Sequence, residues 1–275
     1  MALAVWGLKL GIDFTGGSLL EVEFVGVRPE NSAILEKLNE AGIESAVVQP
    51  TGENGAILRF KDIGEETHQD ILFSLSKLGE VQEKRFDSIG PTIGKELRRN
   101  SLWAIAFVLL MIVLYIAYVF RGVSRLLSSW KYGVAAVIAL FHDIIIPTGL
   151  FAYLGKFHGV EVDTLFVTAL LTILGFSVHD TIVVFDRIRE RLGKSGGREN
   201  FDDVVEQSIR STIGRSINTS LTVFLVMLAL YFWGGDSTRF FSLAIIVGVF
   251  FGTYSSIFIA SALLVSWNKR LSTKK

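Results

Sequence analysis

Five long apolar stretches dominate the last two thirds of the chain, and each is long enough to cross a membrane as a helix. A helix rises about 1.5 Å per residue, so about twenty apolar residues span the ~30 Å hydrocarbon layer. The stretches cover residues 101–120, 132–155, 164–185, 216–235 and 240–267. The pattern predicts an α-helical polytopic membrane protein, with a bundle of five transmembrane helices over 100–270 and a tail at 271–275.

The polar first part, residues 8–99, shows a different periodicity. Leu20, Val22 and Phe24 alternate with Glu21 and Glu23, which is the period of a half-buried strand. Two helices are expected near 29–41 and 66–78, and three more strands near 45–49, 56–61 and 80–86. The order βαββαβ predicts a small α+β domain of the ferredoxin-like type. Its sequence holds no nucleophile–base pair, so we expect docking or substrate handling, and not an enzyme.

A short amphipathic helix is expected between the third and fourth spans, near 199–213. Its apolar positions recur at helical spacing, opposite acidic and basic ones. They are Phe201, Val204, Val205, Ile209 and Ile213. Such a helix lies on the membrane surface or against the protein.

Lysine and arginine are distributed unevenly among the connections, and in membrane proteins this distribution sets the orientation. The successive connections and the tail carry 3, 1, 7, 1 and 4 of them. These residues are Arg121, Arg125 and Lys131; Lys156; Arg187, Arg189, Arg191, Lys194, Arg198, Arg210 and Arg215; Arg239; and Lys269, Arg270, Lys274 and Lys275. The richer connections should be cytoplasmic, which places residues 8–99 outside and the C-terminus inside.

Composition narrows the classes of function. The formal net charge is +0, so no basic excess indicates nucleic-acid binding. Hydrophobic residues make up 50% of the chain, which suits a protein embedded in a lipid bilayer. The absence of cysteine excludes disulfides, thiolate metal sites and thiol catalysis.

Residues 1–7 are apolar but too short to span a membrane, and they lack the basic start of a signal peptide. Because residues 8–99 are expected outside, the topology calls for one more helix before them. We therefore interpret 1–7 as the remnant of a first transmembrane helix, in a fold that would have six. A capping or disordered N-terminus is the alternative.

Two His-Asp pairs interrupt otherwise apolar spans. His142-Asp143 lies in the second span and His179-Asp180 in the third. A charged residue at mid-bilayer costs at least about 2.5 kcal/mol, so such residues face a protein interior or a wet cavity and often move protons. A zinc site built from the two pairs is disfavoured, because adjacent residues on a helix point about 100° apart. We expect no metal site.

A polar stripe enters the fourth span at positions i, i+3, i+4 and i+7, which share one helix face. It consists of Arg215, Asn218, Thr219 and Thr222. We expect Asp180 to be protonated and deprotonated with Arg215 nearby. The supporting residues would be His179, Thr181, Asn218, Asp143 and His142. The alternative is that these groups only satisfy one another and fix the helix packing.

Four motifs, in order along nearly the whole chain, carry a resemblance to a known family. Residues 10–17 read LGIDFTGG, with Gly11, Asp13, Gly16 and Gly17, and residues 89–97 read IGPTIGKEL, with Gly90 and Pro91. Residues 175–190 and 215–222 contain the second His-Asp pair and the polar stripe. The four motifs are similar to those of the SecD/SecF family, and the last two to its SecF branch.

The resemblance implies a protein-transport subunit of the bacterial cytoplasmic (inner) membrane. Such a subunit works with SecD beside the SecYEG channel, with YajC as a further candidate partner. It uses the proton gradient to draw exported unfolded polypeptides outward, and no cofactor is implied. The family's proton-pathway aspartate falls on Asp180 and its pathway arginine on Arg215, whereas the family usually has Asn where His179 stands.

Two other functions are compatible with a proton-binding membrane bundle. The family is related to the resistance-nodulation-division transporters, so a proton-coupled small-molecule exporter is one alternative. Those exporters are much longer and carry two large external domains per chain, whereas one small domain is expected here. The other alternative is an assembly scaffold of the export machinery that conducts no protons.

Overall fold

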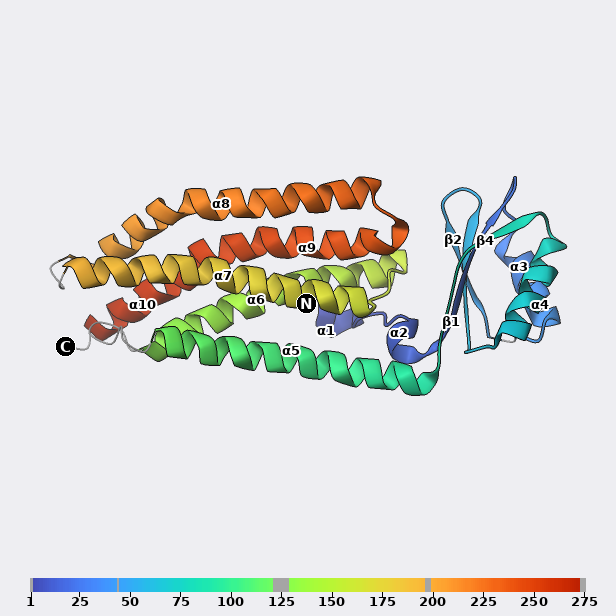
Figure 1. The fold of residues 1–275 in the computed structure, drawn as a ribbon, viewed down its shortest axis with the longest axis horizontal. Helices are drawn as coiled ribbons and strands as arrows, with labels where there is room; N and C mark the ends of the chain where they lie inside the picture. The colour runs from blue at the N-terminus through green and yellow to red at the C-terminus, as the bar shows by residue number, and fades with distance from the viewer. Residues whose placement is uncertain (1, 44, 121–128, 196–198, 273–275) are drawn as a thin grey trace. The chain divides into compact units, whose positions relative to one another are not determined.

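A computed structural model describes residues 2–43, 45–120, 129–195 and 199–272 (Figure 1). The chain divides into two compact units, which are described separately. One unit contains residues 10–101, and the other contains residues 1–9 and 102–275. The predicted tail from 273 onward lies outside the described residues, as do Arg121, Arg125, Arg198, Lys274 and Lys275.

The unit of residues 10–101 is an antiparallel sheet with two helices packed on it. The strands are β1 (Gly17–Phe24), β2 (Val47–Thr51), β3 (Gly55–Phe60) and β4 (Val81–Ile89), in the order β2-β3-β1-β4. The helices are α3 (Asn31–Glu40) and α4 (Glu65–Ser76), preceded by a short α2 (Ile12–Thr15). This is the predicted βαββαβ order, and the ferredoxin-like fold is confirmed.

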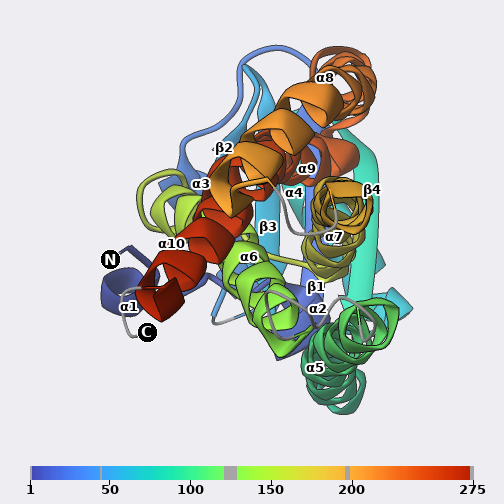
Figure 2. The same ribbon diagram turned by 90° about the vertical axis from the view of Figure 1, so that its left-hand side faces the viewer.

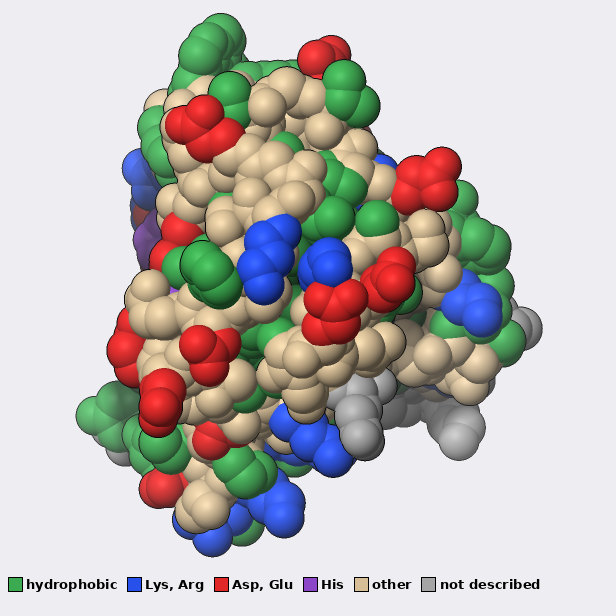
Figure 3. All heavy atoms as spheres, turned by 90° about the vertical axis from the view of Figure 1, so that its right-hand side faces the viewer, with side chains coloured by type: hydrophobic (Ala, Val, Ile, Leu, Met, Phe, Trp, Pro, Cys, Tyr) green, Lys and Arg blue, Asp and Glu red, His purple; other side chains and the backbone are tan. Residues whose placement is uncertain are grey.

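The alternation in β1 builds the core of this unit. Leu20, Val22 and Phe24 are buried, and the glutamates between them point away from the core. The helices add Ile34, Leu38, Ile71 and Leu75 from positions that share one helix face. On the face in Figure 3, acidic and basic side chains are interspersed among hydrophobic ones. No single sign of charge dominates that view.

Five helices in the described residues are long and apolar enough to cross a membrane, as predicted. They are α5 (Pro91–Val119), α6 (Ser129–His158), α7 (Thr164–Ser195), α8 (Phe201–Trp233), and a last one formed by α9 (Asp236–Ser255), η1 (Ser256–Ala260) and α10 (Ser261–Ser272). α5 begins at Pro91, where a proline needs no backbone N–H partner. The protein is therefore a multi-pass membrane protein.

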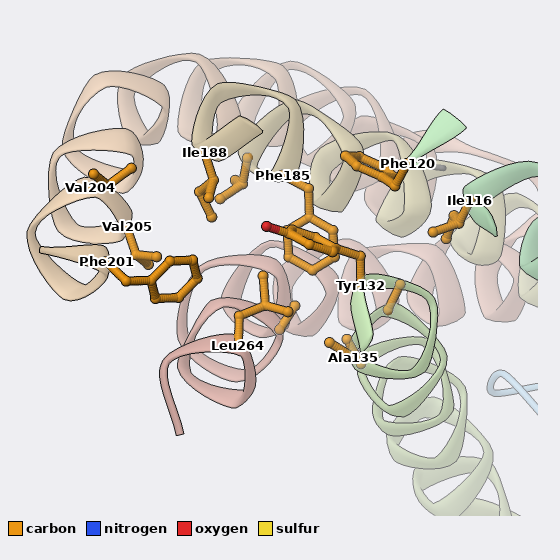
Figure 4. Close-up of a cluster of buried hydrophobic side chains, with 14 residues drawn as sticks. Ile116, Phe120, Tyr132, Ala135, Phe185, Ile188, Phe201, Val204, Val205 and Leu264 are labelled. Carbon is orange, nitrogen blue, oxygen red and sulfur yellow. The ribbon is translucent and has the colours of Figure 1, made fainter. Parts of the chain in front are cut away.

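The helix α9 lies at the centre of the bundle and contacts α6, α7 and α8 (Figure 2). At one end, α5, α6 and α7 share a cluster of aromatic rings (Figure 4). The Tyr132 ring stacks on Phe120 at 5.3 Å and meets Phe185 edge-on at 5.4 Å. Aromatic pairs at these distances add to the burial of apolar area.

A short α1 (Ala2–Trp6) packs against α6 near the C-terminal end of that helix. The Trp6 ring lies edge-on to Phe157 at 5.3 Å. Lys9 forms an ion pair with Glu161 at 3.2 Å, and its carbonyl accepts a hydrogen bond from the Val162 N–H. These contacts tie residues 2–9 to the bundle.

Two helix boundaries differ from the prediction. The amphipathic segment at 199–213 is helical and packs against the protein, which was one of the two expected positions, but it is not a separate helix because α8 runs unbroken from Phe201 to Trp233. Its buried face, which starts with Phe201, Val204 and Val205, continues through Ser208, Thr212 and Ser216 at helical spacing. No proline interrupts it, and a Cβ added at Gly214 would meet nothing within 4 Å. Likewise, α7 continues beyond 185, where the third apolar stretch ends, and passes through Gly193 to Ser195.

A third difference is that the predicted last span contains a π-helical turn. The turn η1 separates α9 from α10 and begins at Ser256. The hydroxyl of Ser261 donates to the Ser256 carbonyl, five residues earlier, at 3.2 Å. A wider turn of this kind is rare and occurs often at functional sites. The apolar pattern of residues 240–267 gave no sign of it.

Candidate functional site

Two buried carboxylates lie in the interior of the helix bundle. Asp143 on α6 is 0% exposed and Asp180 on α7 is 5% exposed. Each comes from an apolar helix, and a carboxylate buried there needs hydrogen-bond partners. Those partners are serines from the neighbouring helices.

Asp143 accepts hydrogen bonds from two helices that pack on α6. Its Oδ2 accepts from the hydroxyl of Ser177 on α7 and from that of Ser255 on α9, the latter at 2.7 Å. Its Oδ1 lies 3.0 Å from the Nδ1 of His142, which donates when the ring nitrogen carries a proton. Asp143 therefore connects three helices.

Asp180 is held in the same way by the next pair of helices. Its Oδ1 accepts from the hydroxyl of Ser216 on α8, and its Oδ2 accepts from that of Ser256, the first residue of η1, at 2.5 Å. All four serines that bond the two carboxylates are buried. One turn away, the hydroxyls of Ser220 on α8 and Thr253 on α9 lie 2.5 Å apart. The hydroxyls and carboxylates form a polar layer in the bundle interior, in two groups that meet at the adjacent residues Ser255 and Ser256.

The helices approach closely at this layer because α9 presents glycines to α7. A Cβ added at Gly252 would lie 3.2 Å from the Cβ of Ser177, and one added at Gly248 would lie 2.9 Å from the Cγ2 of Ile173. The GxxxG pattern of α9 thus lines a helix seam within the chain, as small residues do in membrane bundles.

Arg215 was expected near Asp180, and in the structure the adjacent residue Ser216, not Arg215 itself, bonds that carboxylate. Ser216 and Ser220 form the face of α8 that points toward α9, and Arg215 is exposed on another face. Among the described residues, the structure records no ion pair between Arg215 and Asp180. The predicted polar stripe lies on one exposed face of α8. It consists of Arg215, Asn218, Thr219 and Thr222.

The remaining predicted residues divide between the interior and the surface. His142 is half-buried beside Asp143, whereas His179 is exposed. Thr181 is fully buried, and its hydroxyl has no hydrogen-bond partner among the described residues. No group of three His, Asp or Glu side chains in the described part of the chain could hold a metal ion.

The sequence reasoning missed Ser216, Ser255 and Ser256. Serine is small enough to sit in an apolar stretch without changing its hydropathy, so periodicity does not single it out. The available signal was the adjacent pair Ser255-Ser256 in the middle of an otherwise apolar span.

The two signature motifs meet in the other unit of the chain. Gly16 and Gly17 have φ values of 74° and 127°, which favour glycine. A Cβ on Gly16 would lie 2.7 Å from the Cα of Pro91, and one on Gly94 would lie 2.7 Å from the Gly16 nitrogen. Gly11 and Asp13 lie at the start of α2, and the Gly90 carbonyl accepts from the Gly94 N–H at 3.0 Å. The glycines allow the start of β1 and the start of α5 to touch.

Comparison with known proteins identifies the family. Residues 68–270 match the family described as "Protein export membrane protein SecD/SecF, C-terminal", and residues 2–25 match the "SecD/SecF GG Motif". The chain belongs to the SecD/SecF family. This confirms the resemblance carried by the four motifs.

Two relatives named as SecF illustrate the similarity within the family. A protein translocase subunit SecF from Thermobaculum terrenum is 45% identical, over 98% of this chain and 87% of that protein. One from Anaerolinea thermophila is 42% identical, over 97% of this chain and 87% of that protein. These relatives are named as translocase subunits and not as enzymes.

A solved structure in the same family has the same fold. The crystal structure of SecDF from Thermus thermophilus, a translocon-associated membrane protein, matches with a TM-score of 0.83 and 34% identity. The match covers 98% of this chain and 36% of that one. The chain therefore spans about a third of the length of that SecDF protein.

Proposed function

We propose that this chain is the SecF-type part of a proton-driven protein-export complex, and that Asp180 is protonated and deprotonated during its working cycle. The observation that carries the proposal is the environment of Asp180. Placing a carboxylate in a transmembrane helix costs at least about 2.5 kcal/mol. Helix packing alone does not require a carboxylate at this position, so the cost indicates a function. The two serine partners of Asp180 stabilise the ionised form, and a serine can also accept from the protonated form.

Asp143 and His142 form a second titratable pair connected to the same helices. In this proposal they support Asp180, with Thr181 as a buried hydroxyl beside it and His179 on the outer face of α7. The bundle then has hydrogen-bonding groups on α6, α7, α8 and α9 through which a proton can be taken up and released.

The test replaces Asp180 with Asn and measures export of a secreted protein into membrane vesicles with and without a proton gradient. The matched control is Asp186→Asn, which makes the same change at an exposed position of the same helix. We expect Asp180→Asn to remove the gradient-dependent part of export and Asp186→Asn to retain it. Export unchanged in Asp180→Asn would refute the proton role and leave the scaffold. Accumulation of a dye without an export defect would favour the small-molecule exporter.

We further propose that SecD, or a SecD-like segment, covers the outer face of α8. Arg215 and Asn218 are exposed where α8 enters its apolar stretch, and an uncovered polar face turned toward lipid there would be costly. A partner helix with an acidic or hydroxyl group would remove that cost. SecYEG, the exported polypeptide and YajC are further partners in this proposal.

The partner on α8 can be tested by crosslinking, because the chain has no cysteine of its own. Asn218→Cys should crosslink to single cysteines in the membrane helices of co-expressed SecD. Leu102→Cys, on the exposed face of α5, serves as the comparison. Equal crosslinking from both positions, or none from residue 218, would argue against a partner at the polar stripe.

The basic connections support an orientation with residues 8–99 outside the cytoplasmic membrane and the C-terminus in the cytoplasm. In this orientation the α+β domain meets polypeptides as they emerge, and protons enter from its side. A membrane-impermeant thiol reagent applied to intact cells tests the assignment. It should label Ser76→Cys in α4 and leave Lys269→Cys in α10 unlabelled until the membrane is opened.

A further inference from the structure

We propose that Ser255 and Ser256 are paired hydroxyl switches. Each donates to a carboxylate while that carboxylate is ionised, and each turns to a carbonyl of its own helix when the carboxylate is protonated. The proposal rests on the proposed function, because it takes reversible protonation of Asp180 as given. It adds the residues that convert protonation into a change at α9.

The first observation is that two adjacent residues serve two different carboxylates. The Ser255 hydroxyl donates to Asp143 at 2.7 Å, and the Ser256 hydroxyl donates to Asp180 at 2.5 Å. Adjacent side chains on a helix point about 100° apart, so one helix can reach α6 and α7 at once. Both serines are 0% exposed, so water does not compete for these bonds.

The second observation is that each serine has an alternative acceptor already in place. The Ser255 hydroxyl lies 3.1 Å from the Gly252 carbonyl, and the Ser256 hydroxyl lies 3.0 Å from the Thr253 carbonyl. A rotation of the hydroxyl hydrogen, without any movement of heavy atoms, moves the donation from the carboxylate to the carbonyl. The other two serines, Ser177 and Ser216, have no such second bond recorded among the described residues.

The proton balance is simple. When a proton binds Oδ2 of Asp180, the new O–H must donate, and the Ser256 oxygen is the acceptor beside it. The hydroxyl hydrogen of Ser256 then bonds the Thr253 carbonyl, and no covalent bond of the serine is broken. The same exchange applies to Ser255 and Asp143. Each protonation therefore reverses the direction of one hydrogen bond between α9 and its neighbour.

The third observation places this reversal at a weak point of the helix. Ser256 is the first residue of η1, where the regular α-helical hydrogen-bond pattern is interrupted. When the hydrogen bonds of the Ser256 hydroxyl and the Thr253 carbonyl change, a small rotation of α10 at η1 can accommodate the change. Because α10 contacts α6 and α8, the rotation would be transmitted to those two helices.

Other titratable or charged groups around the two carboxylates have to be considered in any pH experiment. They are His142 on α6, His179 on α7, Arg215 on α8, and Tyr254 on α9, whose ring lies 6.4 Å from that of His142. His142 is the one that bonds a carboxylate directly. For that reason the test compares serine variants with His142 left unchanged.

The experiment uses the complete complex reconstituted in vesicles and compares Ser255→Ala, Ser256→Ala and Ser242→Ala. Ser242 is the matched control, since it is a buried serine of α9 whose hydroxyl donates to the Thr238 carbonyl and to no carboxylate. We expect Ser255→Ala and Ser256→Ala to shift the pH midpoint of gradient-driven export by about one unit or more. A lost charge-assisted hydrogen bond changes proton binding at least about tenfold. Ser242→Ala should show the midpoint of the unchanged protein.

Infrared difference spectra give a second readout that packing alone would not change. The C=O band of the protonated carboxyl is assigned by its disappearance in Asp180→Asn, and Ser256→Ala should shift it while Ser242→Ala should not. Ser256→Thr, which keeps a hydroxyl, should restore both readouts, and Ser256→Cys, a weaker donor, should restore them partly. If Ser256→Ala does not accumulate, Ser256→Cys and Ser255→Ala carry the test.

Unshifted midpoints and an unshifted carboxyl band in the serine variants would overturn the switch, even if Asp180→Asn abolishes gradient-driven export. Unchanged export in Asp180→Asn would instead overturn the proposed function itself. The two failures are therefore distinguishable in the same set of vesicles.

Discussion

The close seam between α7 and α9 predicts a specific defect for Gly248→Ala. A Cβ at this position would lie 2.9 Å from Ile173 Cγ2 and closer still to the Cγ1 and Cδ1 of the same side chain. Carbon atoms pack best at about 3.5–4.0 Å, so the shortfall is at least about 0.6 Å. Ile173 is 0% exposed, so its side chain cannot simply turn into solvent.

The expected size follows from two opposing effects. Overpacking in a filled interior costs about 1–3 kcal/mol. Replacing Gly by Ala inside a helix returns up to about 1 kcal/mol. We therefore expect a net loss of roughly 1–2 kcal/mol in the free energy of unfolding. Gly149→Ala on α6, where a new Cβ meets nothing within 4 Å, is the control and should be neutral or slightly stabilising.

Unfolding by SDS in mixed micelles, followed by tryptophan fluorescence, measures these differences. A double-mutant cycle with Ile173→Ala makes the test specific, because that change removes all three contacting atoms. Ile173→Ala alone should cost about 2–5 kcal/mol by opening a cavity. The double variant should then be more stable than the sum of the two single losses by about 1 kcal/mol or more. Strict additivity, or a Gly248→Ala protein as stable as Gly149→Ala, would show that the seam is not close-packed.

Three further predictions concern the α+β domain and the outer helices. Gly16→Ala should destabilise the junction of β1 and α5 by about 1–3 kcal/mol, because it combines a positive φ with a clash against Pro91. The control Gly64→Ala should cost only a few tenths of a kcal/mol. Hydrogen exchange of residues 10–20 in the full chain measures both effects. The hydrogen bonds from Gln69 and then His68 lower the pKa of Glu65 below 4.5, so its contribution to stability is present above about pH 4.5 and is lost as the pH falls through the lowered value. Hydrogen exchange of α4, referenced to the unfolded protein at each pH, should show that loss, and Glu65→Gln should remove this part of the pH dependence. Phe107→Glu on the exposed apolar face of α5 should sharply reduce membrane insertion or assembly, because it places a charge in lipid. Glu96→Gln, in the first turns of the same helix, should leave insertion and assembly unchanged. A protease-protection assay distinguishes the two variants.

The sequence was sufficient for the elements whose pattern is periodic. The alternation at Leu20, Val22 and Phe24 predicted β1 and the face that it buries, and the five apolar stretches predicted the five long helices. Hydrophobic burial controls these features, and hydropathy is visible residue by residue. The chemical nature of Asp143 and Asp180 was visible for the same reason, because a carboxylate stands out in an apolar span.

The direction in which a helix face points, and the partner of each polar side chain, could not be predicted in the same way. Helical spacing showed that Arg215 and Asn218 share a face, but which way that face points depends on how α8 rotates against α9. That rotation is set by Ser216 and Ser220, small residues that do not stand out in the hydropathy of the span. The π-helical turn at Ser256 depends on local hydrogen bonding and leaves the apolar pattern unchanged.

The two edges of the sheet have a consequence for any extended polypeptide near the α+β domain. Pro50 in the edge strand β2 offers no N–H to another strand, and β4 on the other edge exposes Glu83, Lys84 and Arg85 beside an irregular register with β1. Proline, charge and a bulge are the features that keep a foreign strand from pairing. A polypeptide emerging beside this domain would thus meet side chains instead of a free backbone edge. Such a polypeptide would not be added to the sheet as a fifth strand.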